Sequence, residues 1–108
     1  MMRLVLCNCP PSDAERIARA VVEEGLAACV NAWPVTSTYR WEGAVLSEPE
    51  TTLWIKTAAD RVDALRDRLL ALHPYTLPEV LVLDVDAAAS HPAYLAWVHS
   101  STRASETS

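Results

Sequence analysis

Residues 27–57 read AACVNAWPVTSTYRWEGAVLSEPETTLWIKT and contain two stretches rich in β-forming residues. The first, residues 27–42, is mostly apolar and then alternates, which indicates one long strand kinked near Pro34. A polar segment, residues 43–50, follows it, and we interpret this segment as the turn. The second stretch, residues 52–57, predicts a strand that pairs with the first. Together they predict an extended β-hairpin.

The segment before the hairpin predicts a strand and a helix. Residues 4–7 are an uninterrupted apolar run, typical of a central strand that is covered on both faces. Ser12 and Glu15 have the spacing of a capping box, so we expect a helix to begin there. Apolar side chains then recur at helical spacing until Gly25, which suits a left-handed C-cap.

The segment after the hairpin predicts a second helix, a strand and a short terminal helix. Asp60 is a favourable N-cap, and an apolar stripe follows it as far as Pro74. Residues 80–85 are a mostly apolar run that predicts the last strand. Pro92 suits the first turn of the terminal helix.

This order predicts an α+β fold of the ferredoxin-like type, a β-α-β-β-α-β sandwich with an extended hairpin and a short C-terminal helix. We expect a single domain in residues 1–99 and a flexible polar tail in residues 100–108. Two helices cover only one face of such a sheet. Bulky side chains such as Tyr39, Trp41 and Trp54 exceed what one core can hold, so we expect contacts between subunits.

The charge and cysteine content exclude several classes of protein. The 108 residues include nine Lys and Arg against fourteen Asp and Glu, and the basic residues are scattered along the sequence. We therefore expect neither nucleic-acid nor membrane binding. There is no apolar run of about eighteen residues and no signal-peptide pattern, which predicts a cytoplasmic protein. Three cysteines without a secretory signal fit reduced thiols.

Five segments in order resemble one known family, the CutA divalent-cation tolerance proteins. They are residues 24–31 (EGLAACVN), 36–43 (TSTYRWEG), 55–57 (IKT), 73–79 (HPYTLPE) and 94–97 (YLAW). The resemblance covers nearly the whole chain, from Leu4 to about Val98. It implies a ferredoxin-like homotrimer assembled through the long hairpins, with a role in tolerance of divalent cations, copper especially. It also implies likeness to the trimeric PII-type nitrogen signalling proteins.

The same resemblance implies two copper ligands, Cys7 and His73. A second histidine found directly before this segment in some relatives is Leu72 here. Cys7 and Cys9 are two apart on a strand, so both thiols share a face and form a possible clamp for a soft cation. The alternatives are that Cys7 packs in the core and that His73 caps a helix end.

A second candidate site is a polar cleft between subunits, lined by aromatic rings. We expect the fold to gather Tyr39, Trp41, Lys56, Tyr75 and Glu79 there, with Lys56 and Glu79 as its charges. The alternative is a structural ion pair with interface aromatics. Only the first interpretation predicts a small-molecule or ion ligand in the cleft.

We do not expect an enzyme. A phosphate-binding glycine loop is excluded because the chain has only two glycines, and the remaining nucleophile hypothesis is a cysteine paired with His73. Two functions remain. One is a copper-binding trimer in metal homeostasis, and the other is a PII-like sensor or scaffold that binds a small metabolite in its clefts.

Overall fold

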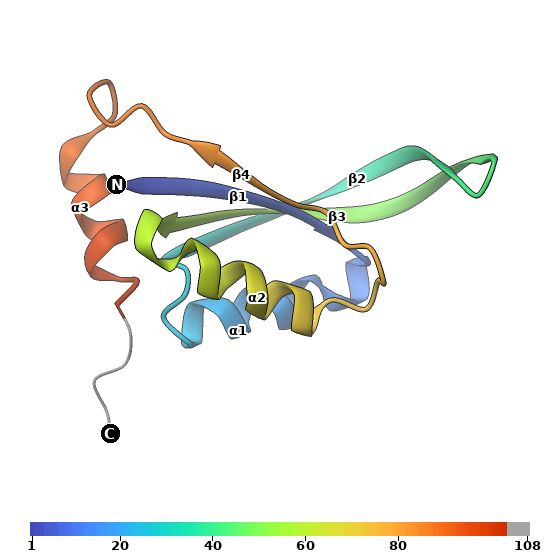
Figure 1. Ribbon diagram of the computed structural model, residues 1–108, viewed down its shortest axis with the longest axis horizontal. Coiled ribbons are helices and arrows are strands. Elements are labelled where there is room, and N and C mark those ends of the chain that lie inside the picture. Colours follow the sequence, from blue (N-terminus) through green and yellow to red (C-terminus); the bar gives the residue numbers. More distant parts are fainter. Residues whose placement is uncertain (104–108) are drawn as a thin grey trace.

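In residues 1–103, which the computed structural model describes, four antiparallel strands form one sheet in the order β2-β3-β1-β4, and three α-helices complete an α+β fold (Figure 1). The strands are β1 (Met2–Cys9), β2 (Cys29–Trp41), β3 (Ala44–Ala58) and β4 (Val80–Asp84), and the helices are α1 (Ala14–Glu23), α2 (Val62–Leu72) and α3 (Pro92–Ser100). The predicted order of elements is confirmed.

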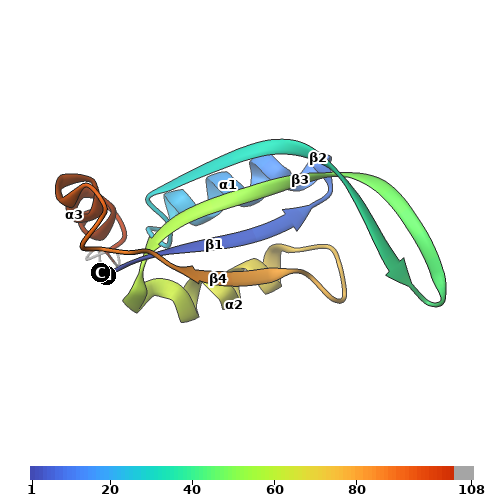
Figure 2. The same ribbon diagram turned by 90° about the horizontal axis from the view of Figure 1, so that it is seen from above.

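Helices α1 and α2 lie on the same side of the sheet, and the core fills the space between them and the strands (Figure 1, Figure 2). Val5 and Cys7 of β1 pair with Ile55 and Leu53 of β3, and all four side chains are at most 1% exposed. The helices contribute their own buried apolar stripes: Ile17 and Val21 from α1, and Leu65 and Leu69 from α2. The opposite face of the sheet carries no helix in the described part of the chain.

The hairpin is longer than the sequence predicts. All thirteen residues of β2 pair with β3, and the turn consists of Glu42 and Gly43 alone, both with positive φ (49° and 83°). The predicted turn over residues 43–50 is therefore wrong, since β3 already begins at Ala44. Two consecutive residues with positive φ match the right-handed twist of the strands, which lets the ladder continue to the tip. The hairpin projects beyond the rest of the sheet (Figure 2).

Two prolines lie inside this ladder without interrupting it. Pro34 lies on β2, which is the outer strand of the sheet. Pro49 lies on β3 beyond Thr51, the last residue of β3 that pairs with β1. At both positions the strand has a neighbour on one side only, so the missing N–H need not leave a ladder hydrogen bond unmade.

Neither predicted N-cap forms. Ser12 lies in a short 3₁₀ turn, Pro11–Asp13, and no side chain caps α1. Asp60 lies in a second 3₁₀ turn, Ala59–Arg61, and no side chain caps α2. Each helix starts instead on a backbone hydrogen bond of its 3₁₀ turn, as when Ala14 N–H donates to the Pro11 carbonyl.

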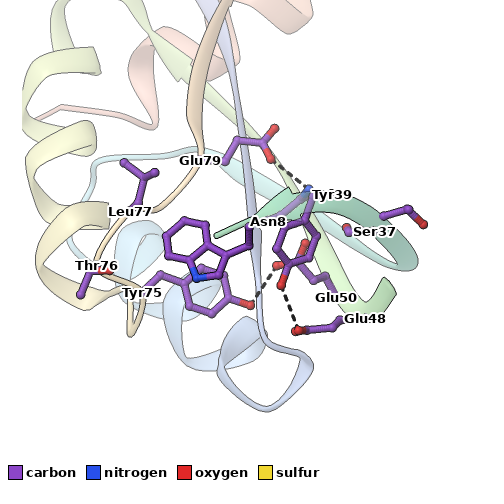
Figure 3. Close-up of a pocket in the computed structure, with 11 residues that line it drawn as sticks. Asn8, Ser37, Tyr39, Glu48, Glu50, Tyr75, Thr76, Leu77 and Glu79 are labelled. Atoms are coloured by element: carbon purple, nitrogen blue, oxygen red, sulfur yellow. Dashed lines mark hydrogen bonds between the residues drawn. The ribbon is translucent and has the colours of Figure 1, made fainter. Parts of the chain in front are cut away.

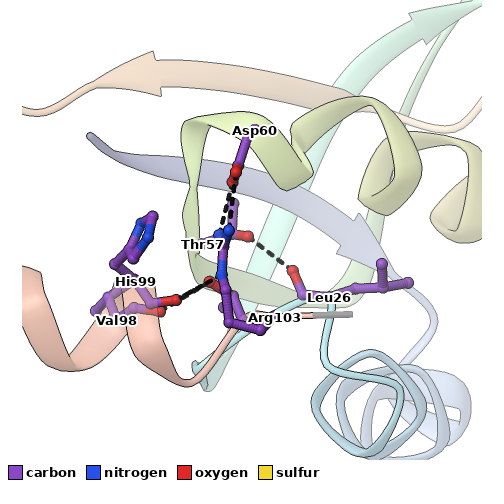
Figure 4. A network of polar contacts seen from close by, with 7 residues as sticks. Leu26, Thr57, Asp60, Val98, His99 and Arg103 are labelled. Atoms are coloured by element: carbon purple, nitrogen blue, oxygen red, sulfur yellow. Dashed lines mark hydrogen bonds and ion pairs between the residues drawn. The ribbon is translucent and has the colours of Figure 1, made fainter. Parts of the chain in front are cut away.

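The chain remains packed beyond α3, where the sequence predicts a loose tail. Ser100 is the last residue of α3, and Thr102 is fully buried. The Arg103 guanidinium donates two hydrogen bonds to Asp60, at 2.9 and 2.7 Å, and a third to the His99 carbonyl (Figure 4). This pairing lowers the pKa of Asp60 to about 2. The rest of the expected tail, residues 104–108, lies outside the described residues.

We expect Gly25→Ala to destabilise the protein more than Gly43→Ala. Both glycines have positive φ, so each substitution carries a backbone cost of about 1 kcal/mol. A Cβ on Gly25 would also lie 2.7 Å from the Arg103 carbonyl oxygen, whereas no atom of the described residues lies within 4 Å of one on Gly43. Thermal unfolding of both variants at equal protein concentration measures the difference. Equal losses would show that the close approach of Arg103 contributes nothing.

Candidate functional site

A pocket of about 590 Å³ lies between the outer half of the hairpin and the loop that joins α2 to β4. Strand β2 contributes Tyr39 and Trp41, and the loop contributes Tyr75 and Glu79. The remaining lining residues are Asn8, Ser37, Thr38, Glu48, Glu50, Thr76 and Leu77. Three aromatic rings and three carboxylates thus share one cavity, whose volume is typical of small-ligand sites.

Two tyrosine hydroxyls hold two of the carboxylates. Tyr39 Oη donates to Glu48 Oε1 and Tyr75 Oη donates to Glu50 Oε2, both at 2.9 Å (Figure 3). The bond to Glu48 raises the pKa of Tyr39. Burial, and then the bond to Glu50, raise the pKa of Tyr75 well above its usual value. Both phenols therefore stay protonated as donors over the physiological pH range.

Glu79, the third carboxylate, accepts a hydrogen bond from a residue of strand β1. Thr52 Oγ1 donates to Asn8 Oδ1 at 2.7 Å, and Asn8 Nδ2 donates to Glu79 Oε1 at 3.1 Å. Asn8 and Thr52 are paired residues of β1 and β3, so both side chains lie on the face of the sheet opposite the helices. The strand pairing therefore fixes the amide that orients Glu79.

His73 anchors the loop that forms the other wall. Its Nε2 donates to the Asn8 carbonyl at 2.7 Å, and its Nδ1 accepts from the Tyr75 N–H at 3.2 Å. The His73 and Tyr75 rings lie 4.7 Å apart between centroids. Because a carbonyl only accepts and an N–H only donates, these contacts require the neutral ring with its proton on Nε2. Neither nitrogen keeps a free lone pair for a metal in this arrangement.

The structure brings together four of the five residues predicted for the cleft: Tyr39, Trp41, Tyr75 and Glu79. Lys56 lies elsewhere, where its Nζ donates to Asn31 Oδ1 and is 3.8 Å from Cys29 Sγ. Within one subunit, therefore, Lys56 and Glu79 are not brought together, and their joint role in a cleft between subunits stays a prediction. Lys56 lies six residues from Glu50 along β3, too far toward the other end of the strand to reach the pocket.

Sequence reasoning missed Asn8, Glu48 and Glu50. Glu48 and Glu50 are two residues apart, so on a strand they share a face. Interpreting residues 43–50 as a turn hid this spacing. A strand predicted through Pro49 would have placed both carboxylates on one face by simple alternation. In the structure Glu48 pairs with Ser37 and Glu50 with Val35, and all four side chains lie on that face.

The cysteines predicted for metal binding are core residues. Cys7 and Cys9 are fully buried on the helix-covered face of β1. Burial raises the pKa of Cys7 to about 12 and the pKa of Cys9 to about 11, with nearby acidic groups adding to both. Both are therefore neutral thiols, whereas a metal ligand or nucleophile is a thiolate. In residues 1–103 no three His, Cys, Asp or Glu side chains are grouped so that they could hold a metal ion.

The family is decided by a match over almost the whole chain: residues 3–101 match the family model described as CutA1 divalent ion tolerance protein. The chain belongs to the CutA1 divalent ion tolerance family. This confirms the resemblance noted in the sequence.

Individual CutA proteins agree with this assignment. The chain is 43% identical over 104 residues to the divalent-cation tolerance protein CutA of Thermus thermophilus. The alignment covers 94% of this chain and 99% of that protein. The PII-like protein CutA from Nostoc sp. PCC 7120 superposes with a TM-score of 0.93 at 45% identity, over 95% of this chain and 99% of that one.

The compartment of CutA proteins varies. The Archaeoglobus fulgidus protein, with a TM-score of 0.90 and 30% identity over 95% of this chain and all of its own, is described as periplasmic. No helix in residues 1–103 of this chain is long and apolar enough to cross a membrane. The cytoplasmic location expected from the sequence stays a prediction.

We expect Cys7 and Cys9 to resist alkylation in the native protein. Both thiols are buried and their pKa values of about 12 and 11 keep them protonated at pH 8, so a thiolate-selective reagent such as iodoacetamide has no target. Mass spectrometry after digestion measures labelling at each cysteine. Full labelling is expected in denaturant, which serves as the control. Rapid labelling of Cys7 without denaturant would contradict the buried, neutral thiol.

Proposed function

We propose that this CutA protein is a non-enzymatic, PII-like sensor or carrier that binds a small ligand in the pocket of Tyr39, Trp41, Tyr75 and Glu79. The observation that carries the proposal is the pocket itself. It has the volume of a small-ligand site, its rings are between 37% and 44% exposed, and its polar groups are oriented by hydrogen bonds before any ligand arrives.

We also propose that the protein works as a homotrimer, the number three coming from the family resemblance. Support comes from the sheet face opposite α1 and α2, where Trp33, Leu81 and Leu83 are between 38% and 54% exposed. An apolar face of this kind is typical of a subunit interface. Sedimentation velocity measures the mass of the assembly, and a monomer at micromolar concentration would contradict this part of the proposal.

The second candidate function is copper binding in divalent-cation tolerance, with Cys7 and His73 as ligands. It is supported by the family and by the name of the Thermus relative. It has a structural cost, because the metal would have to ionise a buried thiol and displace the hydrogen bond that His73 Nδ1 accepts from the Tyr75 N–H. The pocket requires no such rearrangement, so we rank it first.

For the pocket, we expect Trp41→Ala to abolish or strongly weaken ligand binding. A fluorescence-monitored thermal-shift screen of a small-metabolite set on wild type identifies ligands, and calorimetry measures their affinities in the variants. Trp97→Ala is the matched control, since Trp97 lies on α3 outside the pocket and is similarly exposed, 46% against 44%. A ligand that binds both variants as it binds wild type is not in this pocket, and a screen without ligands contradicts the proposal.

For copper, we expect weak binding that does not respond to Cys7→Ala or His73→Ala. A titration of the reduced protein measures stoichiometry and affinity, with Cys29→Ala as the control for loss of a thiol outside the core cluster. Because core substitutions reduce stability, each variant is first checked for cooperative unfolding. A tight site at integral stoichiometry that disappears in both variants but not in Cys29→Ala would instead establish the copper function.

A further inference from the structure

The carboxylates of the pocket, unlike most others in the described residues, have no basic partner within the subunit. Among the described residues that line the pocket, none is Lys, Arg or His. Most other carboxylates pair with arginine, as Glu24 does with Arg68 and Asp60 with Arg103. Glu48, Glu50 and Glu79 form no ion pair in the described chain, so within one subunit three negative charges face one cavity.

Glu50 is the most enclosed of the three carboxylates. Its side chain lies in the pocket wall and the residue is only 9% exposed, although it is charged. One carboxylate oxygen accepts from Tyr75, and no hydrogen bond to the other is present in the described residues. Burying a carboxylate without a compensating charge is costly, so a site of this kind gains stability when a cation enters.

The same pattern holds for the other two carboxylates. Glu48 accepts from Tyr39 through Oε1, and Glu79 accepts from Asn8 through Oε1. Each carboxylate is therefore held in place by one neutral donor, with its second oxygen available to a donor from the ligand. Three acceptors at separate points of a cavity fit a ligand with several N–H donors.

The size and walls of the pocket favour an organic cation over a metal ion. A volume of about 590 Å³ is far larger than a metal ion needs, and the described residues contain no three-donor metal group. The rings of Tyr39, Trp41 and Tyr75 line the same space, and the negative face of an aromatic ring attracts a cation. Rings also offer apolar contact area to the carbon skeleton of a ligand, which a bare metal ion cannot use.

We propose that this pocket binds an organic cation of the primary ammonium or guanidinium class. Its N–H donors contact the second oxygens of Glu48, Glu50 and Glu79, and its carbon skeleton packs against the rings. The inference rests on the proposed function, because it names the ligand class of the same site.

Putrescine, a four-carbon diamine, is the first probe, and two molecules of similar length and different charge are its controls. Calorimetry on the intact protein at neutral pH compares putrescine with the neutral butane diol and with succinate. We expect putrescine to bind at least about tenfold more tightly than the diol and succinate not to bind. We also expect putrescine affinity to fall as salt is added, since charge attraction is screened.

Substitutions then locate the binding site. Glu48→Gln and Glu79→Gln keep the shape of exposed side chains and remove one charge each, and each should weaken putrescine binding about tenfold. Glu15→Gln is the matched control, because it removes one charge from an exposed side chain on α1 away from the pocket, and it should change affinity less than about twofold. An equal effect of all three variants would overturn the inference, because only the net charge would then matter.

The outcomes separate the ligand class from the function. If the diol binds as tightly as putrescine, or succinate binds better, the organic-cation inference is wrong and the ligand pocket stands. If no probe of the three binds, the inference is also wrong. The metabolite screen with Trp41→Ala then decides whether the pocket function survives.

Discussion

The pocket depends on the register between β2 and β3. Side chains alternate between the two faces of a strand. A shift of β2 by one residue against β3 would therefore put Tyr39 on the face of the sheet opposite to Glu48 and Glu50. The two-residue turn at Glu42 and Gly43 sets this register at the tip. At the other end, pairing with β1 holds Leu53 and Ile55 of β3 in the core, where burial contributes about 1.5–3 kcal/mol for each side chain. Core burial thus fixes a site that lies well away from the core.

His73 transmits this constraint to the second wall of the pocket. Through one imidazole it connects the end of β1 to the loop that carries Tyr75. A residue that family resemblance marks as a copper ligand therefore acts as a loop anchor in this chain. The two roles compete for the same lone pair on Nδ1, because that nitrogen accepts the Tyr75 N–H. Metal binding at His73 and an intact pocket wall are consequently alternative states of one ring.

The distribution of arginines explains why the pocket is acidic. The chain carries a net charge of −5, and several of its arginines pair with acids on the helices and near the C-terminus. The pocket receives none of them. A nucleotide or another phosphate ligand would meet three carboxylates there, which opposes binding. The likeness of the Nostoc protein to PII therefore extends to the fold of this chain, while the local charge favours a ligand of opposite sign.

The sequence by itself determined the order of the elements, the long hairpin and the family, because apolar periodicity and short motifs are local properties. It also selected Tyr39, Trp41, Tyr75 and Glu79. It did not determine the helix starts at Ser12 and Asp60, where backbone turns replaced side-chain caps. Nor did it give the charge of the cleft. Only the tertiary structure decided that, because strand register and loop anchoring place Glu48, Glu50 and Asn8 beside the rings and leave Lys56 outside.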